Sequence, residues 1–149
     1  MPIKPPQLRP GDTIGIVTLG TPLEAARIDE GIATLKAMGF NVVVGDSTYA
    51  SNGFLAGTPE SRAADLMKMF ANKDVRCILP TRGGVGVAAI LPFLNFPIIK
   101  ANPKIISGYS GTIPTNFRES TATEIEKIKA AEIDEISSII EKAIVVKPD

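Results

Sequence analysis

The sequence predicts an α/β protein in which a mostly parallel sheet is flanked by helices, in Rossmann-like or flavodoxin-like layers, with a C-terminal amphipathic helix. Short apolar runs of strand length alternate with helix-length segments along residues 13–108, and glycine, proline or asparagine stands at the junctions. The chain has 149 residues, of which 44% are hydrophobic and 21% charged. This length and composition fit one ordinary globular core and exclude a disordered or collagen-like chain.

The first predicted strand and helix follow a proline-rich arm. Residues 13–19 (TIGIVTL) form a short apolar run of strand type. Thr21 and Glu24 have the spacing of a capping box, and Pro22 suits the first helical position. A helix is therefore expected from Thr21 to about Met38, with apolar residues at spacings of three and four along one face.

The second strand and helix are expected at residues 41–45 and from Thr58 to about Ala71. Residues 41–45 (NVVVG) are continuous in valine, so we expect this strand to be buried on both faces. Residues 46–58 are rich in turn-forming residues and are expected to form a loop. Thr58 followed by Pro59 is typical of a helix start.

Two more strands complete the alternation, at residues 75–80 (VRCILP) and 105–108 (IISG). Between them lie a glycine-rich loop at 81–86 (TRGGVG) and a short helix at 87–94. Ligands of open parallel sheets bind at the carboxyl ends of the strands. The expected binding region consists of the loops that follow three of the strands: residues 18–22, 81–86 and 109–112.

The charge distribution divides the chain near residue 118. Residues 1–118 carry 12 basic and 8 acidic side chains, whereas residues 119–149 carry 4 basic and 8 acidic ones. Thr121 and Glu124 form a second capping-box pattern, and apolar spacing predicts a helix over residues 122–142. We therefore predict an α/β domain over 1–118 and an acidic helical tail over 119–149.

Composition excludes several classes of chemistry. The chain has no histidine and one cysteine. It therefore has no Ser-His-Asp triad, Cys-His dyad, His-ligated metal, multi-cysteine zinc site or intrachain disulfide of its own. It has no basic run for nucleic acid, no apolar stretch of membrane-spanning length and no apolar signal core, so we expect a cytoplasmic protein. Cys77 lies within an apolar strand and is expected to be buried and structural.

Ser110 is the candidate nucleophile. Small residues two positions before and after a serine permit the tight strand-to-helix turn that exposes its hydroxyl, and here those residues are Gly108 and Thr112. The backbone N–H of the next residue, Gly111, would then face a developing oxyanion. The usual G-x-S-x-G pattern is not met because position 112 is threonine. The alternative is a plain glycine-containing turn after a buried strand.

The glycine-rich loop is the candidate anion site. Glycines between a strand and a helix expose backbone N–H groups that suit an anion or oxyanion. Gly84, Gly86 and Ala89 also match the looser dinucleotide pattern G-x-G-x-x-A. That pattern expects an acidic residue at the end of the next strand, where this chain has Tyr109 and Ser110. A plain tight turn remains the other alternative.

Several motifs together resemble the LD-carboxypeptidases, serine peptidases related to the microcin-immunity peptidases. The segments PGDTIGIV, GTPESRAADL, TRGGVG and GYS occur in order within residues 3–113. The resemblance implies hydrolysis of an L,D-peptide bond that releases terminal D-alanine from muropeptides during cell-wall recycling in the cytoplasm. It also implies a Ser-His-Glu triad, a dimer, a peptide substrate and no metal or other cofactor.

The same resemblance implies roles for four residues. The serine of the family's GYSD motif falls on Ser110, the nucleophile. The oxyanion would be bound by the glycine-rich loop, at Gly83 or Gly84, and by the N–H of Gly111. Position 111 is glycine where the family usually has aspartate. The family's glutamate and histidine lie in a second domain, which is missing from these 149 residues.

Three functions therefore remain open. The first is a serine peptidase that retains the nucleophile and oxyanion half of its site and is nearly inactive for want of a base. The second is a truncated or engineered structural or peptide-binding module without catalysis. The third is a nucleotide-binding domain that uses residues 84–86.

We also expect self-association. A domain without its partner domain exposes the surface that the partner covers, and exposed apolar surface promotes association. Light scattering at several protein concentrations should therefore detect a dimer or larger homo-oligomer. A monomer at every concentration would contradict this expectation.

Overall fold

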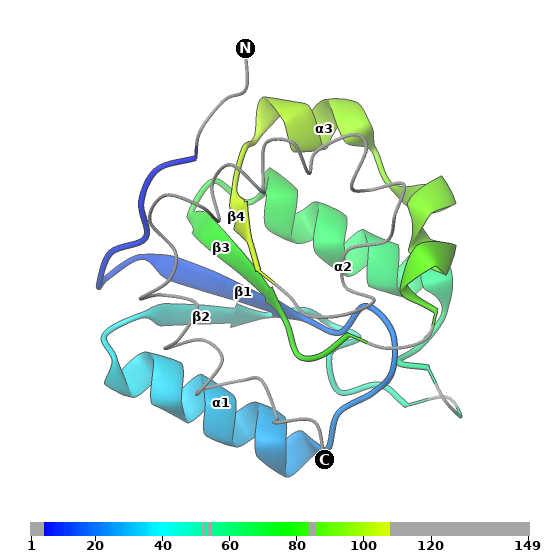
Figure 1. The fold of residues 1–149 in the computed structure, drawn as a ribbon, viewed down its shortest axis with the longest axis horizontal. Helices are drawn as coiled ribbons and strands as arrows, with labels where there is room; N and C mark the ends of the chain where they lie inside the picture. Colours follow the sequence, from blue (N-terminus) through cyan, green and yellow to red (C-terminus); the bar gives the residue numbers. More distant parts are fainter. Residues whose placement is uncertain (1–4, 52, 54, 84–85, 108–149) are drawn as a thin grey trace.

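A computed structural model describes residues 5–51, 53, 55–83 and 86–107 of the chain (Figure 1). The expected acidic tail over 119–149 and its helix over 122–142 lie outside these residues. No helix in the described ranges is long and apolar enough to cross a membrane.

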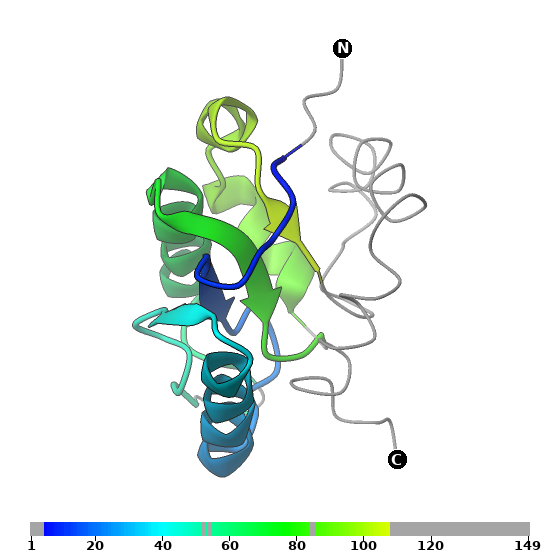
Figure 2. The same cartoon turned by 90° about the vertical axis from the view of Figure 1, so that its left-hand side faces the viewer.

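The described residues form a four-stranded parallel sheet with helices on both faces, which confirms the predicted fold class (Figures 1 and 2). The strands lie in the order β2-β1-β3-β4. Their bounds are β1 Thr13–Val17, β2 Asn41–Val44, β3 Val75–Pro80 and β4 Ile105–Ile106. The helices are α1 Ala25–Ala37, α2 Pro59–Ala71, the 3₁₀ helix η1 Val87–Phe93 and α3 Phe96–Ala101.

Two hydrophobic clusters cover the two faces of the sheet. On one face, Ile14, Ile16 and Leu79 pack with Leu35 of α1. On the other face, α2, η1 and α3 pack over a cluster that includes Val17 and Ile78. β1 and β3 lie at the centre of the sheet. After β1 the chain forms β2 on one side of β1, and it then crosses β1 to form β3 on the other side. The topological switch point therefore lies between the carboxyl ends of β1 and β3.

The close approach of α2 to the sheet requires glycine at Gly15. A Cβ atom at this position of β1 would lie 2.6 Å from Sδ of Met69, on α2. Such a distance is far inside van der Waals contact, so a larger residue would force the Met69 side chain to move or α2 to shift outward. The glycine of TIGIV thus lets the Met69 side chain pack directly on β1.

The start of α2 agrees with the sequence prediction. Thr58 is the N-cap, and its hydroxyl oxygen accepts a hydrogen bond from the backbone N–H of Ser61 at 3.1 Å. Pro59 takes the first helical position, where a missing N–H costs nothing. The helix ends at Ala71, as the apolar spacing predicts.

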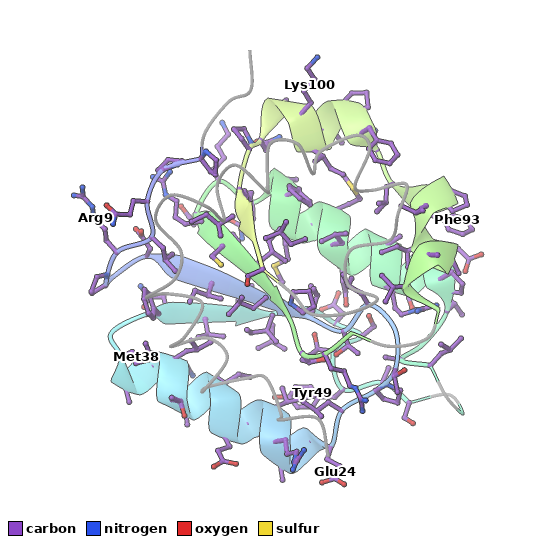
Figure 3. All side chains as sticks on the ribbon, viewed as in Figure 1. Arg9, Glu24, Met38, Tyr49, Phe93 and Lys100 are labelled. Carbon is purple, nitrogen blue, oxygen red and sulfur yellow. The ribbon has the colours of Figure 1, made fainter. Side chains whose placement is uncertain are left out.

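The predicted start of α1 at Thr21 is wrong. The helix begins at Ala25, with Glu24 as an N-cap that makes no side-chain capping bond; Figure 3 labels Glu24 and Met38 at the two ends of this helix. The chain before the helix is held by tertiary hydrogen bonds: the carbonyl of Gly20 accepts the N–H of Ala56 at 2.9 Å. These contacts keep residues 18–22 in a loop and delay the first helical turn.

The prediction that residues 41–45 are buried on both faces is also wrong. β2 is an edge strand whose residues alternate between exposed and half-buried, and Val43 is 37% exposed. Val42 packs with the cluster beneath α1, whereas the cluster on the opposite face includes no residue of β2. A run of valines indicates a strand, but its burial depends on which elements lie over it.

Smaller differences concern lengths and one missed helix. β1 and β4 are shorter than predicted, and the helix after the glycine-rich loop is a 3₁₀ helix. α3 was not expected. Its N-cap, Asn95, accepts the N–H of Ile98 at 3.2 Å, and Pro97 lies in its first turn. The helix has only six residues, so its apolar spacing was too short to detect.

The Thr58 cap gives a test of the fold. Replacing Thr58 with alanine should lower the free energy of unfolding by about 1 kcal/mol, because the N–H of Ser61 loses its acceptor. Urea denaturation followed by circular dichroism would measure this loss. Thr58→Ser keeps a hydroxyl acceptor and serves as the control. Equal stability of the alanine variant and the wild type would contradict the assigned cap.

Candidate functional site

The described residues bring together two of the three predicted loops. Residues 18–22 and the glycine-rich loop (residues 81–86) follow β1 and β3, which are neighbours in the sheet. β4 runs parallel to β3, and the described chain ends at Ser107, at the same edge. The third predicted loop, 109–112, lies outside the described residues. The candidate site is thus the carboxyl edge of the sheet at the switch point.

A buried pair of threonines fixes the start of the glycine-rich loop. Thr18 and Thr81 are both buried, and their hydroxyl oxygens lie 2.8 Å apart. The hydroxyl of Thr18 donates its single proton to the carbonyl of Thr48 at 2.8 Å, so Thr81 is the donor to Thr18. The N–H of Thr81 also donates to the carbonyl of Val17 at 2.8 Å. The loop therefore leaves β3 in a position set by β1.

The end of the glycine-rich loop needs glycine for two reasons. Gly86 has φ of +87°, in the left-handed region that side chains disfavour. A Cβ atom there would lie 2.6 Å from Cδ2 of Leu55. Gly86 is the N-cap of η1, so this conformation turns the loop into the 3₁₀ helix.

Arg62 of α2 ties this end of the loop to the exit of β1. The side chain is fully buried, with no exposed surface. Its Nη1 donates to the carbonyl of Leu19 at 2.6 Å and to that of Gly86 at 3.2 Å. Its Nε donates to the carbonyl of Thr58, within its own helix start, at 3.3 Å. One guanidinium thus joins three segments that are far apart in sequence.

The charge of Arg62 has no counterion among the described residues. No described carboxylate forms an ion pair with it, whereas Lys68 and Asp46, which do pair, are largely exposed. Its Nη2 is buried without a hydrogen-bond partner in the described part of the chain. Burial lowers the pKa of Arg62, partly offset by Glu60. An arginine nevertheless stays protonated in proteins, so this edge of the sheet carries a buried positive charge.

Asp65, one turn further along α2, organises the exit of β2. Its carboxylate accepts the N–H and the hydroxyl of Ser47 and, at 3.2 Å, the N–H of Asp46. A Cβ atom at Gly45 would lie 2.7 Å from Oδ2 of Asp65, so this approach also needs glycine. The buried polar residues of α2 therefore hold the connections after both β1 and β2.

Sequence reasoning did not single out Arg62 or Asp65. A signal was present for Arg62, because it precedes Leu66 by four residues and Met69 by seven, on the buried face of the predicted helix. A charged residue at such a position is rarely buried without a structural or functional reason. The contacts it makes could not be inferred, since they involve loops whose neighbours depend on the strand order.

The predicted site residues are only partly described. Gly83 is buried within the glycine-rich loop. Gly84, Ser110 and Gly111 lie outside the described residues, so their roles stay predictions. The dinucleotide pattern G-x-G-x-x-A begins at Gly84, outside the described residues. The element after Gly86 is a seven-residue 3₁₀ helix, whereas that fingerprint opens an α-helix. Within the described residues, no cluster of three or more acidic, cysteine or histidine side chains could hold a metal ion.

Cys77 is a buried structural residue, as predicted. It lies on β3 with no exposed surface and packs in the cluster beneath α1. Burial raises the pKa of its thiol to about 12. Since the thiolate is the reactive form, Cys77 is not a nucleophile near neutral pH.

The strand order defines an α/β protein with a parallel sheet, whose candidate site lies at the switch point. A family profile described as the LD-carboxypeptidase N-terminal domain matches residues 14–128. The chain belongs to the LD-carboxypeptidase family.

Individual relatives agree with this assignment. The chain is 35% identical over 107 residues to a "Probable murein peptide carboxypeptidase" of Bacillus subtilis, covering 72% of this chain and 34% of the relative. It is 37% identical over 114 residues to the "Microcin C7 self-immunity protein MccF" of Escherichia coli, covering 74% and 33%. A solved structure of MccF with aspartyl sulfamoyl adenosine superposes with a TM-score of 0.75 at 34% identity, covering 83% and 37%. The chain spans about a third of the length of the curated relatives that it matches.

Burial of Cys77 predicts its reactivity and a pH effect on stability. At about pH 8 the folded protein should react with a thiol reagent orders of magnitude more slowly than the unfolded chain. An unfolded thiol has a pKa of about 8.5, and the folded value is about 12. The stability from the protonated thiol is therefore fully present below about pH 8.5 and is lost as the pH rises toward 12, by up to about 1.4 kcal/mol per pH unit.

Denaturation at several alkaline pH values would measure this slope. The control is Cys77→Ala, which should lack this part of the slope whatever its absolute stability. Rapid labelling of the folded protein would contradict the buried assignment.

Proposed function

We propose that this chain provides the nucleophile and oxyanion half of an LD-carboxypeptidase-type serine peptidase, which hydrolyses L,D-peptide bonds and releases terminal D-alanine from muropeptides. The observation that carries the proposal is the family match over residues 14–128, which includes the glycine-rich loop at the switch point and Ser110. A murein peptide carboxypeptidase among the relatives supports the substrate class.

In the proposed reaction, the hydroxyl of Ser110 attacks the scissile carbonyl while a base accepts its proton. The carbonyl oxygen becomes an oxyanion, which the N–H groups of Gly83 or Gly84 and of Gly111 stabilise. The leaving amine departs as D-alanine after protonation, and water then hydrolyses the acyl-serine. The buried threonines hold the start of the glycine-rich loop in place for this step.

The base must come from outside these 149 residues. The sequence contains no histidine, and no other side chain has an unperturbed pKa suited to this role near neutral pH. Loss of the base and its orienting group leaves only the acceleration that comes from oxyanion binding and substrate binding. We therefore expect the isolated chain to bind substrate and to turn it over very slowly.

A second candidate function is a peptide-binding module without catalysis, which the absence of histidine favours. The solved structure of the MccF relative in complex with aspartyl sulfamoyl adenosine supports binding of a small molecule that carries an aspartyl group. An active-site serine probe separates the two candidates. Labelling of Ser110 supports the peptidase, and its absence supports the module.

Activity of the chain tests the proposal. A tetrapeptide ending in an L,D bond to D-alanine should bind more tightly than its all-L diastereomer, measured by calorimetry. Release of D-alanine should be several orders of magnitude slower than by a complete peptidase, because the base is absent. Ser110→Ala should abolish the residual release, whereas the control Ser107→Ala should retain it.

Two results would count against the proposal. Equal affinity for the two diastereomers, with no Ser110-dependent release, contradicts the peptidase assignment. Turnover comparable to that of a complete peptidase, abolished by Ser110→Ala, contradicts the claim that the base lies elsewhere.

A further inference from the structure

Arg62 is a buried charged group that the chemistry of the proposed site does not use. It has no exposed surface, so it does not touch a bound peptide directly. Its hydrogen bonds go to carbonyl oxygens and to no described carboxylate. Buried cations are ordinarily paired with an anion, because an unpaired charge loses its hydration without compensation. The cost of burying this guanidinium therefore calls for a function.

The position of its bonds suggests that function. A single nitrogen, Nη1, bridges the carbonyl of Leu19, after β1, and that of Gly86, at the end of the glycine-rich loop. Besides Nη1, the Gly86 carbonyl accepts the N–H of Ala89 at 3.2 Å, within η1. Arg62 is thus a link from this end of the loop to the rest of the sheet edge.

The start of the loop has a separate link to the same strand exit. Thr81 donates to Thr18, the residue immediately before Leu19. Two consecutive residues after β1 therefore hold the two ends of the glycine-rich loop, one directly and one through Arg62. Preorganised donors stabilise a developing oxyanion because they need not reorient during the reaction. Holding both ends fixes where the described parts of the loop, residues 81–83 and Gly86, lie relative to β1.

We propose that Arg62 is a positioning residue, which holds the glycine-rich loop in its anion-binding conformation and makes this edge of the sheet electrostatically positive for a carboxylate-terminated peptide. The electrostatic role toward a peptide rests on the proposed function. The second role, a tether formed by the hydrogen bonds of Arg62 to Leu19 and Gly86, does not. The charge of Arg62 acts through space, since no described carboxylate forms an ion pair with it, although the carboxylate of Glu60 also acts on it. Hydrogen bonds to two carbonyls could also come from a neutral donor, so charge and tether can be separated by experiment.

The tether is tested by hydrogen exchange in the full chain. The amides of Ala56 and Ala89 donate to the carbonyls of Gly20 and Gly86, at or next to the carbonyls that Arg62 binds. Arg62→Met should raise the exchange rates of these two amides by about tenfold or more relative to those of β3. The matched control is Arg27→Met, the same change at an exposed position of α1, which should leave these rates unchanged. Unchanged rates in Arg62→Met would overturn the tether. Because no ligand is added, this result does not depend on the proposed function.

Chemical rescue tests the charge. Arg62→Ala should bind the D-alanine tetrapeptide about tenfold more weakly or worse, and millimolar guanidinium should restore the affinity. Urea has the same planar shape and donates similar hydrogen bonds but is neutral, so it should restore slow exchange without restoring affinity. Equal rescue of affinity by urea, or unchanged affinity in Arg62→Ala, would overturn the electrostatic role.

A conservative variant covers the case in which the alanine or methionine variant does not fold. Arg62→Lys keeps the charge on a side chain one bond shorter. It should retain most of the peptide affinity while exchange at Ala56 and Ala89 becomes faster. Affinity as low as that of a neutral variant would contradict the role of the charge. If the wild type does not bind the tetrapeptide at all, the proposed function fails, and the exchange data alone decide the tether.

Discussion

The packing of α2 along one face of the sheet, with its N-terminal turns at the carboxyl ends of the strands, is the constraint on which the rest of the structure depends. The helix approaches the sheet over Gly15 and Gly45, where a Cβ atom would clash with Met69 and Asp65. At that depth, Arg62 reaches the carbonyls after β1 and in the glycine-rich loop, and Asp65 reaches the amides after β2. Backbone groups at three loops thereby find hydrogen-bond partners on one helix, as buried polar groups require.

This arrangement holds both ends of the glycine-rich loop. The glycines that an anion site needs remove side chains and add conformational freedom. Buried side-chain bonds compensate at both ends of the loop, through Thr18 with Thr81 and through Arg62 with Gly86. Burying the Arg62 guanidinium on α2 costs free energy, because the charge loses its hydration. A role for this charge in ligand binding at the sheet edge accounts for that cost.

Membership of the LD-carboxypeptidase family and the missing imidazole point to a divided site. The matched family region is an N-terminal domain, and the relatives are about three times as long as the part they share with this chain. An α/β domain of this kind can orient a nucleophile and an oxyanion pocket, since both lie at strand ends. Under the proposed function, a base on another element meets them at this edge, and the described residues contribute the contacts that hold the two ends of the glycine-rich loop.

Local signals in the sequence determined the alternation of strands and helices, the Thr58 cap, the buried Cys77 and the family motifs, because each depends on neighbouring residues alone. They also determined that this chain supplies no imidazole. Only the tertiary structure decided that α1 begins at Ala25 and that β2 is a half-exposed edge. It alone revealed that Arg62 links two loops. These features depend on which segments become neighbours, and hydrogen bonds between distant loops override local capping and burial preferences.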